Sequence, residues 1–408
     1  MSRAGRGVAF FGTPLGIVFT TVLIDLIGFG IVIPLMPLYA ERFGASPTQI
    51  GLLTASYALM QFLFAPVWGR VSDRIGRRPV ILASLVGTAA ASLMFGLAGA
   101  LWLLFLARAL DGISGASYAA AQAYVADVTS PDERAHGMGM IGAAFGLGVV
   151  IGPALGALFA AADPRLPFFV AAALAAGNFA LAWRRLPESR RPGSAPTTYS
   201  RLALLRSSLG SRALAPLVWL SFTGTFGFVA MEATFALLGE RRFDFGLAEI
   251  GLVFTYIGVV AAMVQGGAVR IAVKRLGEWM VLRIGLVATG ASLALLAATD
   301  ELWELFPVLF LLAAGSGLVF PTVTALVSHR APAGDQGGVL GLLASTGGLA
   351  RVTSPVVATA LFEHVAHAAP YVLGAALFGL CALLSVGATD GVRGRLTPGA
   401  AGAQSRDA

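Results

Sequence analysis

About twelve apolar stretches, each of about 20 residues and long enough to cross a lipid bilayer, follow one another along this chain. Their approximate centres are Asp25, Leu59, Ala90, Gly115, Gly148, Ala175, Phe226, Val260, Ala288, Ser316, Gly348 and Phe378. Charged residues make up only 12% of the 408 residues, whereas a soluble domain carries about 25%. Because a segment in lipid must satisfy its own backbone hydrogen bonds, each stretch is expected to be a helix. The sequence therefore predicts an all-α polytopic membrane protein with about twelve transmembrane helices.

The distribution of positive charge predicts how these helices are oriented. The net charge is +7, which is also typical of proteins that bind nucleic acid. When both termini are placed inside, however, the basic side chains that fall on the outer side are only Arg42, Arg165, Arg241 and Arg242. This is the positive-inside pattern, so we expect cytoplasmic termini and no nucleic-acid partner. The single lysine among 28 basic residues is typical of a GC-rich bacterial genome, which indicates a bacterial inner membrane.

One polar break divides the apolar stretches into two sets of six. Residues 184–212 are rich in Arg, Ser and Pro and lack apolar periodicity, which is typical of a linker. The predicted organisation is an N-terminal six-helix bundle at 1–186, a cytoplasmic linker at 187–212, a C-terminal six-helix bundle at 213–390 and a disordered cytoplasmic tail at 391–408.

The two sets repeat each other at an offset of about 200 residues. Residues 43–51, which begin with Phe and end with Ile-Gly, correspond to residues 243–251, and Pro153 corresponds to Pro355. Duplicated six-helix units pack around a pseudo-two-fold axis along the membrane normal, with the substrate site at mid-depth between them. The repeat therefore predicts two pseudo-symmetric six-helix bundles.

Asp25 is a carboxylate near the middle of the first predicted span. A charge at this depth costs several kcal/mol to bury unless it is paired or hydrated, so it is a candidate functional residue. A carboxylate that is exposed to each side of the membrane in turn can take up and release a proton. The alternative role is a structural hydrogen bond between two helices.

The fourth predicted span carries a stripe of polar and small residues at spacings of three and four. Its members are Arg108, Asp111, Gly115, Tyr118 and Gln122. This spacing places them on one face of a helix, and we expect that face to line a cavity because lipid would not accept it. Arg108 and Asp111 lie one turn apart and can neutralise each other. The alternative is a static buried ion pair.

Polar residues on three other spans complete the candidate cavity. Glu232 on the seventh span has Phe228 one turn away, which suits a lipophilic or cationic substrate, although Glu232 is also placed for gating. Tyr57 and Gln61 share one face of the second span. Arg351 lies at mid-depth of the eleventh span, where a buried guanidinium needs a partner from another helix. The candidates for that partner are Asp25, Asp111 and Glu232.

A basic segment connects the second and third spans. Residues 69–79 contain four arginines and Asp73, and such charges mark a membrane surface. Gly69 and Gly76 are expected to let the chain turn. We expect Asp73 to accept hydrogen bonds from the arginines and from the N-terminus of a neighbouring helix, and residues 127–134 to supply complementary charges. This predicted polar cluster comprises Gly69, Asp73, Arg74, Gly76, Arg77, Arg78, Asp127 and Arg134.

The fifth predicted span contains a spaced set of small residues. Its members are Gly139, Gly148, Gly152, Pro153 and Gly156. Small residues let helices approach closely in a membrane, and proline loosens the backbone hydrogen-bond ladder. On these grounds alone, the set indicates close helix packing and no further role.

These motifs together resemble the Major Facilitator Superfamily. The basic segment resembles its signature loop, G-x-x-x-D-R-x-G-R-[RK], and residues 108–112 match its fourth-helix pattern, R-x-x-[polar]-G. Residues 57–67 and 186–189, and the surroundings of Asp25, look like the tetracycline/proton antiporters of that superfamily. The spacing in the fifth span resembles the antiporter motif of its exporters, which its symporters generally lack.

The resemblance implies roles for several residues. Arg108 is implied to support proton transfer or substrate binding. The polar cluster around residues 69–79 is implied to be a cytoplasmic gate, which latches the two halves when the cavity faces outward. The second-half copy has Lys274 in place of the aspartate, so the latch is expected to be one-sided. The tetracycline branch has an acid in its third helix that residues 80–99 lack, and its eighth-helix histidine and ninth-helix aspartate are Ala262 and Thr289 here. These departures argue against tetracycline as the substrate.

We therefore expect a secondary active transporter that works by alternating access, namely a proton-coupled antiporter that exports small lipophilic or cationic compounds. Its expected partners are a small-molecule substrate, protons and the lipid bilayer. We expect a monomer because two halves form the cavity by themselves, and we expect no cofactor or metal, Cys381 being the only cysteine.

Two alternatives stay open on the sequence. The first is a proton-coupled importer of a nutrient or metabolite on the same fold, which the fifth-span motif disfavours. The second is a non-transporting membrane sensor or enzyme, although the sequence contains no H-E-x-x-H, G-x-S-x-G or phosphate-loop motif.

Overall fold

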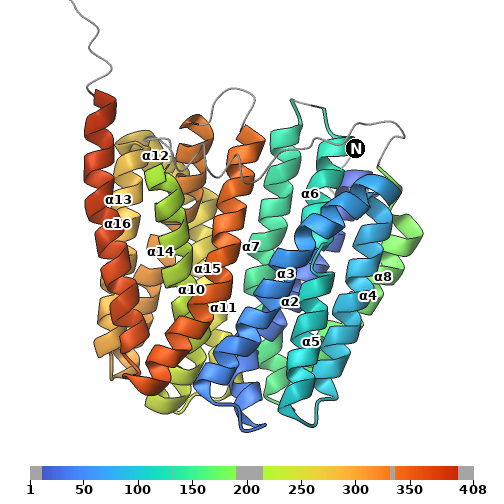
Figure 1. The fold of residues 1–408 in the computed structure, drawn as a ribbon, viewed down its shortest axis with the longest axis horizontal. Helices are drawn as coiled ribbons and strands as arrows, with labels where there is room; N and C mark the ends of the chain where they lie inside the picture. Colours follow the sequence, from blue (N-terminus) through green and yellow to red (C-terminus); the bar gives the residue numbers. More distant parts are fainter. Residues whose placement is uncertain (1–11, 131, 190–214, 331–335, 394–408) are drawn as a thin grey trace, which may run out of the picture.

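The computed structural model describes residues 12–393 except 131, 190–214 and 331–335. Within this part the chain is helical and contains no strand. Figure 1 shows the helices packed side by side in a bundle, with the connections gathered at its two ends. Most of the predicted linker and tail lies outside the described residues, so the domain boundaries stay a prediction.

The helices form two sets along the chain, here called the first half and the second half. The first half consists of α2 (Pro14–Glu41), α3 (Pro47–Ile75), α4 (Arg77–Gly96), α5 (Leu101–Ser114), α6 (Ser117–Val128), α7 (Arg134–Ala160) and α8 (Leu166–Arg185). The second half consists of α10 (Ala215–Phe243), α11 (Leu247–Met263), the π-helical turn η1 (Val264–Ala268), α12 (Val269–Leu276), α13 (Glu278–Ala298), α14 (Leu302–Arg330), α15 (Gln336–His364) and α16 (Ala369–Arg393).

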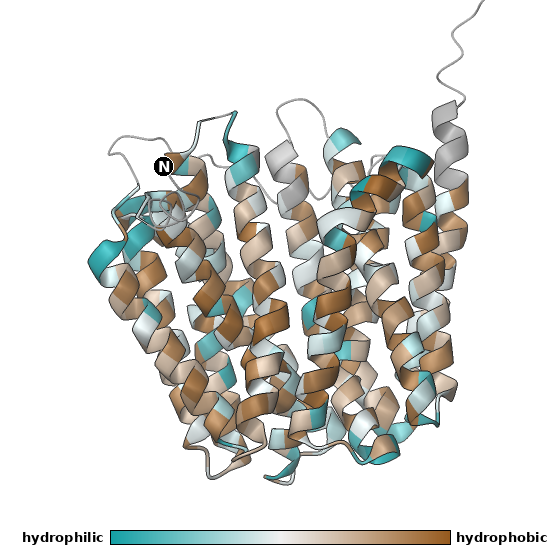
Figure 2. Ribbon diagram, turned by 180° about the vertical axis from the view of Figure 1, so that it is seen from behind, coloured by the Kyte–Doolittle hydropathy of each residue, from teal (hydrophilic) through white to brown (hydrophobic). Residues whose placement is uncertain are grey.

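Ten helical segments in the described part are long and apolar enough to cross a membrane. One of these runs through α11, η1 and α12 without a gap. The other two predicted spans are α15 and the pair α5 and α6, whose pieces have 14 and 12 residues. Figure 2 shows hydrophobic residues along the sides of the bundle and hydrophilic residues concentrated at its ends. The predicted all-α polytopic fold is therefore confirmed.

Local sequence explains how the first two spans begin and run. Ser46 and Gln49 form a capping box at the start of α3, and Pro47 follows at the first helical position, where its missing N–H has no cost. Pro34 and Pro37 lie inside α2. In a membrane such prolines are tolerated because neighbouring helices compensate for the lost backbone bonds.

The two ends of the bundle are different surfaces. We call the end that carries the α3–α4 connection at Gly76 the loop face, and the opposite end, with the α2–α3 and α10–α11 connections, the far face. Helix α2 begins and α16 ends at the loop face (Figure 1). Both described ends of the chain therefore lie on the same side of the bundle.

The halves meet along two seams that the repeat relates to each other. In one seam α3 packs on α15, and a Cβ built on Gly51 would lie 2.6 Å from the carbonyl oxygen of Pro355. In the other α11 packs on α7, and a Cβ built on Gly251 would lie 2.9 Å from the carbonyl oxygen of Pro153. Such approach of backbone to backbone requires glycine. Each half thus presents its glycine to the proline-containing helix of the other half.

Polar contacts close the far face. Arg241 Nη2 lies 2.9 Å from Glu41 Oε1, and this ion pair joins α10 to α2. Glu363 Oε2, at the end of α15, accepts hydrogen bonds from Ser46 Oγ at 3.1 Å and from the Thr48 amide at 2.7 Å. These contacts connect the start of α3 to the second half.

The loop-face part of α7 is open by contrast. A Cβ built on Gly139, Gly142 or Gly146 would meet nothing within 4 Å, and Phe145 is exposed. The halves are therefore in close contact toward the far face and at mid-depth, and they separate toward the loop face.

Candidate functional site

The site begins at Asp25, which lies half-buried on α2 and accepts a hydrogen bond from the Ser117 hydroxyl at the start of α6. This contact joins the first span to the fourth. Tyr57 and Asp111 lie within electrostatic range of Asp25. Three helices of the first half therefore bring titratable groups to the same depth.

The fourth span is broken beside Asp25, so the prediction of one continuous helix face is wrong here. Helix α5 ends at Ser114 and α6 begins at Ser117. Ser84 on α4 donates to the Ser114 carbonyl oxygen and accepts from the amides of Ala116 and Ser117 at 3.2 and 3.0 Å. A buried hydroxyl thus satisfies backbone groups that the break releases.

Arg108 is the most deeply buried charge of the site, with 2% of its surface exposed. Its Nη1 lies 3.7 Å from Asp111 Oδ2, as the spacing predicts. Its guanidinium also lies over the rings of Tyr57 and Phe95, with Cζ at 5.2 and 5.7 Å from the ring centroids. Arg108 Nε has no hydrogen-bond partner within the described part of the chain. An unpaired polar group is costly in surroundings of low dielectric constant, so Arg108 is a candidate for a functional role.

The polar face of the second span lies against the break. Gln61 Nε2 donates to Tyr57 Oη at 3.1 Å and to the Gly115 carbonyl oxygen at 3.3 Å. The ring of Phe29 on α2 lies 5.6 Å from that of Tyr57. The predicted lining residues Tyr57 and Gln61 therefore lie between the first and fourth spans.

Beyond the break, Tyr118 and Gln122 are half-buried on α6. The ring of Tyr118 packs edge-on against Phe145 of α7 at 6.3 Å. Since Phe145 is exposed beside the open part of α7, this end of the stripe borders the space between the halves.

The second half contributes one acid and one base. Glu232 is half-buried on α10 and lies within electrostatic range of Arg108 and Arg351. Arg351 on α15 is exposed, so the prediction that it is buried is wrong. Phe228, one turn from Glu232, packs edge-on against Phe320 at 5.6 Å. Charges from both halves thus influence one another.

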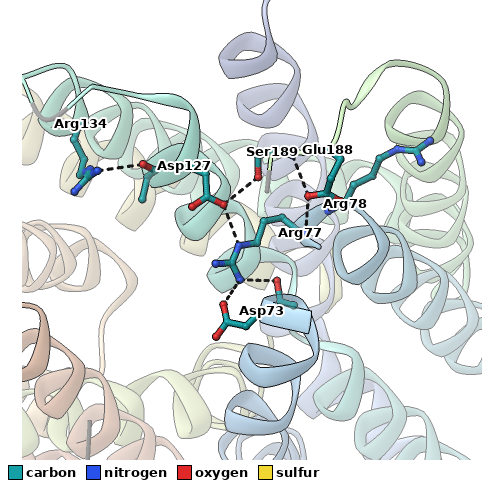
Figure 3. A network of polar contacts seen from close by, with 9 residues as sticks. Asp73, Arg77, Arg78, Asp127, Arg134, Glu188 and Ser189 are labelled. Atoms are coloured by element: carbon teal, nitrogen blue, oxygen red, sulfur yellow. Dashed lines mark hydrogen bonds and ion pairs between the residues drawn. The ribbon is translucent and has the colours of Figure 1, made fainter. Parts of the chain in front are cut away.

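At the loop face, Arg77 is the centre of a polar network (Figure 3). Its Nη1 lies 2.7 Å from Asp73 Oδ1 and 3.1 Å from Ser72 Oγ, and its Nε lies 3.1 Å from Asp127 Oδ2. The predicted complementarity between the basic segment and Asp127 is present. All of these residues belong to the first half.

Glu188, which the sequence analysis did not single out, holds the turn before α4. Its carboxylate accepts from the amides of Arg77 and Arg78 at 2.9 and 3.2 Å, so it satisfies the first amides of the helix and stabilises the positive end of its dipole. Asp73 was expected to accept from the N-terminus of a neighbouring helix, but the side chain that accepts at the start of α4 is Glu188. Gly76 makes the turn with φ of 106°.

The other gate residues take different places. Gly69 lies inside α3, so it makes no turn, and a Cβ built on it would meet nothing within 4 Å. Arg74 is exposed. Arg78 Nη2 donates to the Trp183 carbonyl oxygen at 2.6 Å. Arg134 Nη2 donates to the Ala126 carbonyl oxygen at 3.2 Å, which fixes the α6–α7 connection.

The small residues of the fifth span divide into two groups. A Cβ built on Gly148 or Gly152 would lie 2.6 Å from Leu26 Cβ or from Gly30 Cα of α2. A Cβ built on Gly156 would lie 3.2 Å from the Ile31 carbonyl oxygen. The ring of Pro153 lies against Gly30 of α2, and its carbonyl oxygen lies against Gly251 of the second half. A Cβ built on Gly139 would meet nothing within 4 Å, so Gly139 takes no part in this packing. Helix α7 is therefore held closely between α2 and α11 through the rest of the motif.

The second-half copy of the gate has reversed polarity. Gly277, with φ of 79°, precedes α13, and Glu278 takes the place that corresponds to Arg77. Its Oε1 lies 3.1 Å from Nδ1 of His329, near the end of α14. A carboxylate paired with a histidine thus replaces an arginine paired with a carboxylate.

A bundle of paired halves, with a hydrophobic outer surface and interacting charges at mid-depth, defines a polytopic membrane transporter. The chain belongs to the Major Facilitator Superfamily, whose family model matches residues 18–355 and 271–405. It is a multi-pass protein of the inner membrane.

Relatives cover nearly the whole chain. It is 34% identical to the tetracycline resistance protein, class C, of Escherichia coli over 374 residues, which is 90% of this chain and 94% of that protein. It is 29% identical to multidrug resistance protein 1 of Bacillus subtilis over 356 residues, which is 86% of this chain and 90% of that protein.

Solved structures have the same fold. The human organic anion transporter MFSD10 (TETRAN) is 28% identical with a TM-score of 0.70, and the match covers 91% of this chain and 98% of that one. A POT family transporter matches with a TM-score of 0.76 over 93% of this chain and 96% of that one at 14% identity, which shows the fold alone.

Proposed function

We propose that the protein is a proton-coupled antiporter that exports small lipophilic or cationic compounds by alternating access. The observation that carries the proposal is the shared mid-depth cluster. In it Asp25 interacts with Asp111, Asp111 pairs with Arg108, and Glu232 of the second half interacts with Arg108 and Arg351. Relatives named for tetracycline and multidrug resistance support export over import. The spacing of small residues in the fifth span, which resembles the antiporter motif of exporters, also supports this direction.

The positive-inside bias supports a cytoplasmic loop face with both termini inside. The state described here, closed at the far face, then receives substrate from the cytoplasm. Separation of the Gly51–Pro355 and Gly251–Pro153 contacts, together with closure near the Arg77 network, exposes the site to the outside. A proton taken up from outside replaces the substrate at a carboxylate, and its release to the cytoplasm resets the cycle.

A cluster of three carboxylates and two guanidinium groups favours cationic or neutral substrates. Protonation of one carboxylate balances the fixed charges, so it removes the attraction for a cation when the site faces outward. Thr289, at a position where the tetracycline branch has an acid, is fully buried and donates to the Gly285 carbonyl oxygen of its own helix at 2.8 Å. This packing role supports a substrate other than tetracycline.

We further propose that the transporter acts as a monomer, without a cofactor and without catalysing a chemical reaction. The two seams already place both halves around the charged cluster, so one chain supplies all the residues of the proposed cycle.

The test uses inside-out vesicles energised to an acid interior, a pH-sensitive dye and a panel of lipophilic cations, antibiotics and metabolites. We expect an added substrate to trigger proton efflux, which Asp25→Asn abolishes and Glu232→Gln weakens. Asp300→Asn, which changes an exposed far-face carboxylate, is the matched control and should behave as wild type. Accumulation in right-side-out vesicles under an inward proton gradient, without efflux of any compound, would overturn export in favour of import.

A further inference from the structure

The break in the fourth span is an unusual place for exposed backbone groups, because it lies inside the membrane-spanning bundle next to Asp25. Unsatisfied amides and carbonyls in such a place cost several kcal/mol each. The observed partners come from two neighbouring helices. The Ser84 hydroxyl of α4 hydrogen-bonds to the Ser114 carbonyl oxygen and to the amides of Ala116 and Ser117. Gln61 Nε2 of α3 donates to the Gly115 carbonyl oxygen. The break is therefore a built feature of the fold.

The break also gives the fourth span a helix N-terminus at mid-depth. Helix α6 begins at Ser117 and has 12 residues, so a partial positive charge is associated with this end. The Ser117 hydroxyl donates to Asp25, which fixes the carboxylate of α2 at that positive end. Discontinuous helices in transporters place their N-terminal ends near anionic groups in the same way.

We propose that Ser117 and Ser84 are positioning residues for proton exchange at Asp25. Ser117 donates a hydrogen bond to the ionised carboxylate, and Ser84 holds the break open so that the start of α6 stays directed at it. This inference rests on the proposed role of Asp25 as a proton-carrying group. The titratable groups facing Asp25 are Tyr57 of α3 and Asp111 of α5, and Asp111 is in turn paired with Arg108.

The repeat provides a matched control on α14, which corresponds to the fourth span. Ser316 is buried like Ser117, but its hydroxyl donates to the Ala313 carbonyl oxygen of its own helix at 3.3 Å. Ser316→Ala therefore removes a buried hydroxyl at comparable depth without touching Asp25.

The experiment is an infrared pH titration of the purified full chain in lipid, using the carboxylic-acid band that Asp25→Asn removes. In Ser117→Ala the midpoint of this band should move to higher pH by about one unit, because the ionised form loses a hydrogen bond and the neutral form loses less. Ser84→Ala should move it the same way by less, whereas Ser117→Thr, which keeps the hydroxyl, and Ser316→Ala should leave it in place.

The pH profile of substrate-triggered proton efflux should shift together with the band. An unmoved midpoint in Ser117→Ala, with efflux lowered equally at all pH values, would show that the serine is only structural and would overturn the positioning role while the proposed function stands. If Asp25→Asn removes no band and leaves efflux intact, the proposed role of Asp25 fails and this inference fails with it.

Discussion

The fourth span and α14 correspond in the repeat, yet they differ in both continuity and charge. The fourth span is broken between Ser114 and Ser117 and carries Arg108 and Asp111. Helix α14 is continuous, and its buried Ser316 bonds only within the helix. Duplication has preserved the packing plan, whereas the polar groups at mid-depth are concentrated in the first half.

The same contrast holds at the loop face. Arg77 contacts three side chains of the first half. Its counterpart Glu278 is paired with His329, which is largely exposed and is charged only when protonated. On the proposed function, we therefore expect the first half to carry the proton chemistry and the stronger gate contacts, while the second half supplies Glu232 and a weaker ion pair.

The sharpest test of this unequal division compares the two half-specific carboxylates. Asp25→Asn should lower proton-coupled export by about 100-fold or more, because a neutral amide cannot carry a proton. Glu232→Gln should instead raise the half-saturating concentration of a cationic substrate by about tenfold, because it removes one charge-assisted contact. Vesicle efflux measured against substrate concentration separates the two effects, and equal loss of maximal rate in both variants would remove the distinction.

The seams should respond alike, since the repeat relates them. Gly51→Leu or Gly251→Leu places a side chain against backbone atoms at 2.6 or 2.9 Å, so each should force the far face open and lower export about tenfold. Spin labels on the far face, in a Cys381→Ala background, measure the opening as a longer distance.

Gly139→Leu is the control for the seam variants. It lies on α7, but its Cβ would meet nothing within 4 Å, so the far-face label distance should stay at the wild-type value. Opening in only one of the two seam variants would show that the seams are not equivalent.

Unlike the two seams, the two gate copies should respond differently to substitution. Arg77→Ala removes contacts to Asp73, Ser72 and Asp127 and should lower transport about five- to tenfold, as expected for loss of a partly buried charged network. Arg77→Lys should recover only part of this, because an ammonium cannot reproduce the guanidinium fork. Glu278→Gln should change transport by less than about twofold, because exposed ion pairs contribute little. A larger effect at Glu278 would reverse the assigned importance of the two copies.

A small effect is also expected for the ion pair that joins the halves at the far face. Arg241→Gln should change the rate by about two- to threefold, since a partly exposed pair contributes about 1 kcal/mol at most. The charge exchange Glu41→Arg with Arg241→Glu should restore the wild-type rate. Rates measured for the two single variants and the double variant at low and high salt give the coupling energy, and a double variant no better than the singles would exclude the pair from gating.

Sequence periodicity and spacing were enough to predict the spans, the repeat and the ion pair of Arg108 with Asp111. They were insufficient at the break, because the spacing from Arg108 to Gln122 fits a continuous helix and the groups that stabilise the break come from α3 and α4. Ser84 and Ser117 carry no charge and belong to no motif that marks them. Only the clustering of small and hydroxyl residues at 114–117 could have indicated an interruption.

Similar reasons explain the errors at the gate and on α15. Glu188 caps α4 from 110 or more positions away along the chain, and local spacing cannot identify such a partner. The signature glycines look alike in sequence, but only Gly76 has a positive φ. Arg351 was expected to be buried because a helix in lipid hides its charges, whereas the separation of the halves toward the loop face leaves it exposed.

The reciprocal seams have the form of an isologous dimer interface. In such an interface one patch contacts a second patch on the partner, and the second patch contacts the first in return. Gly51 on Pro355 and Gly251 on Pro153 repeat that relation within a single polypeptide, which makes the transporter equivalent to a tethered homodimer. Covalent continuity raises the effective concentration of each half for the other. The interface can therefore be weak enough to come apart in every cycle without the halves being lost from each other.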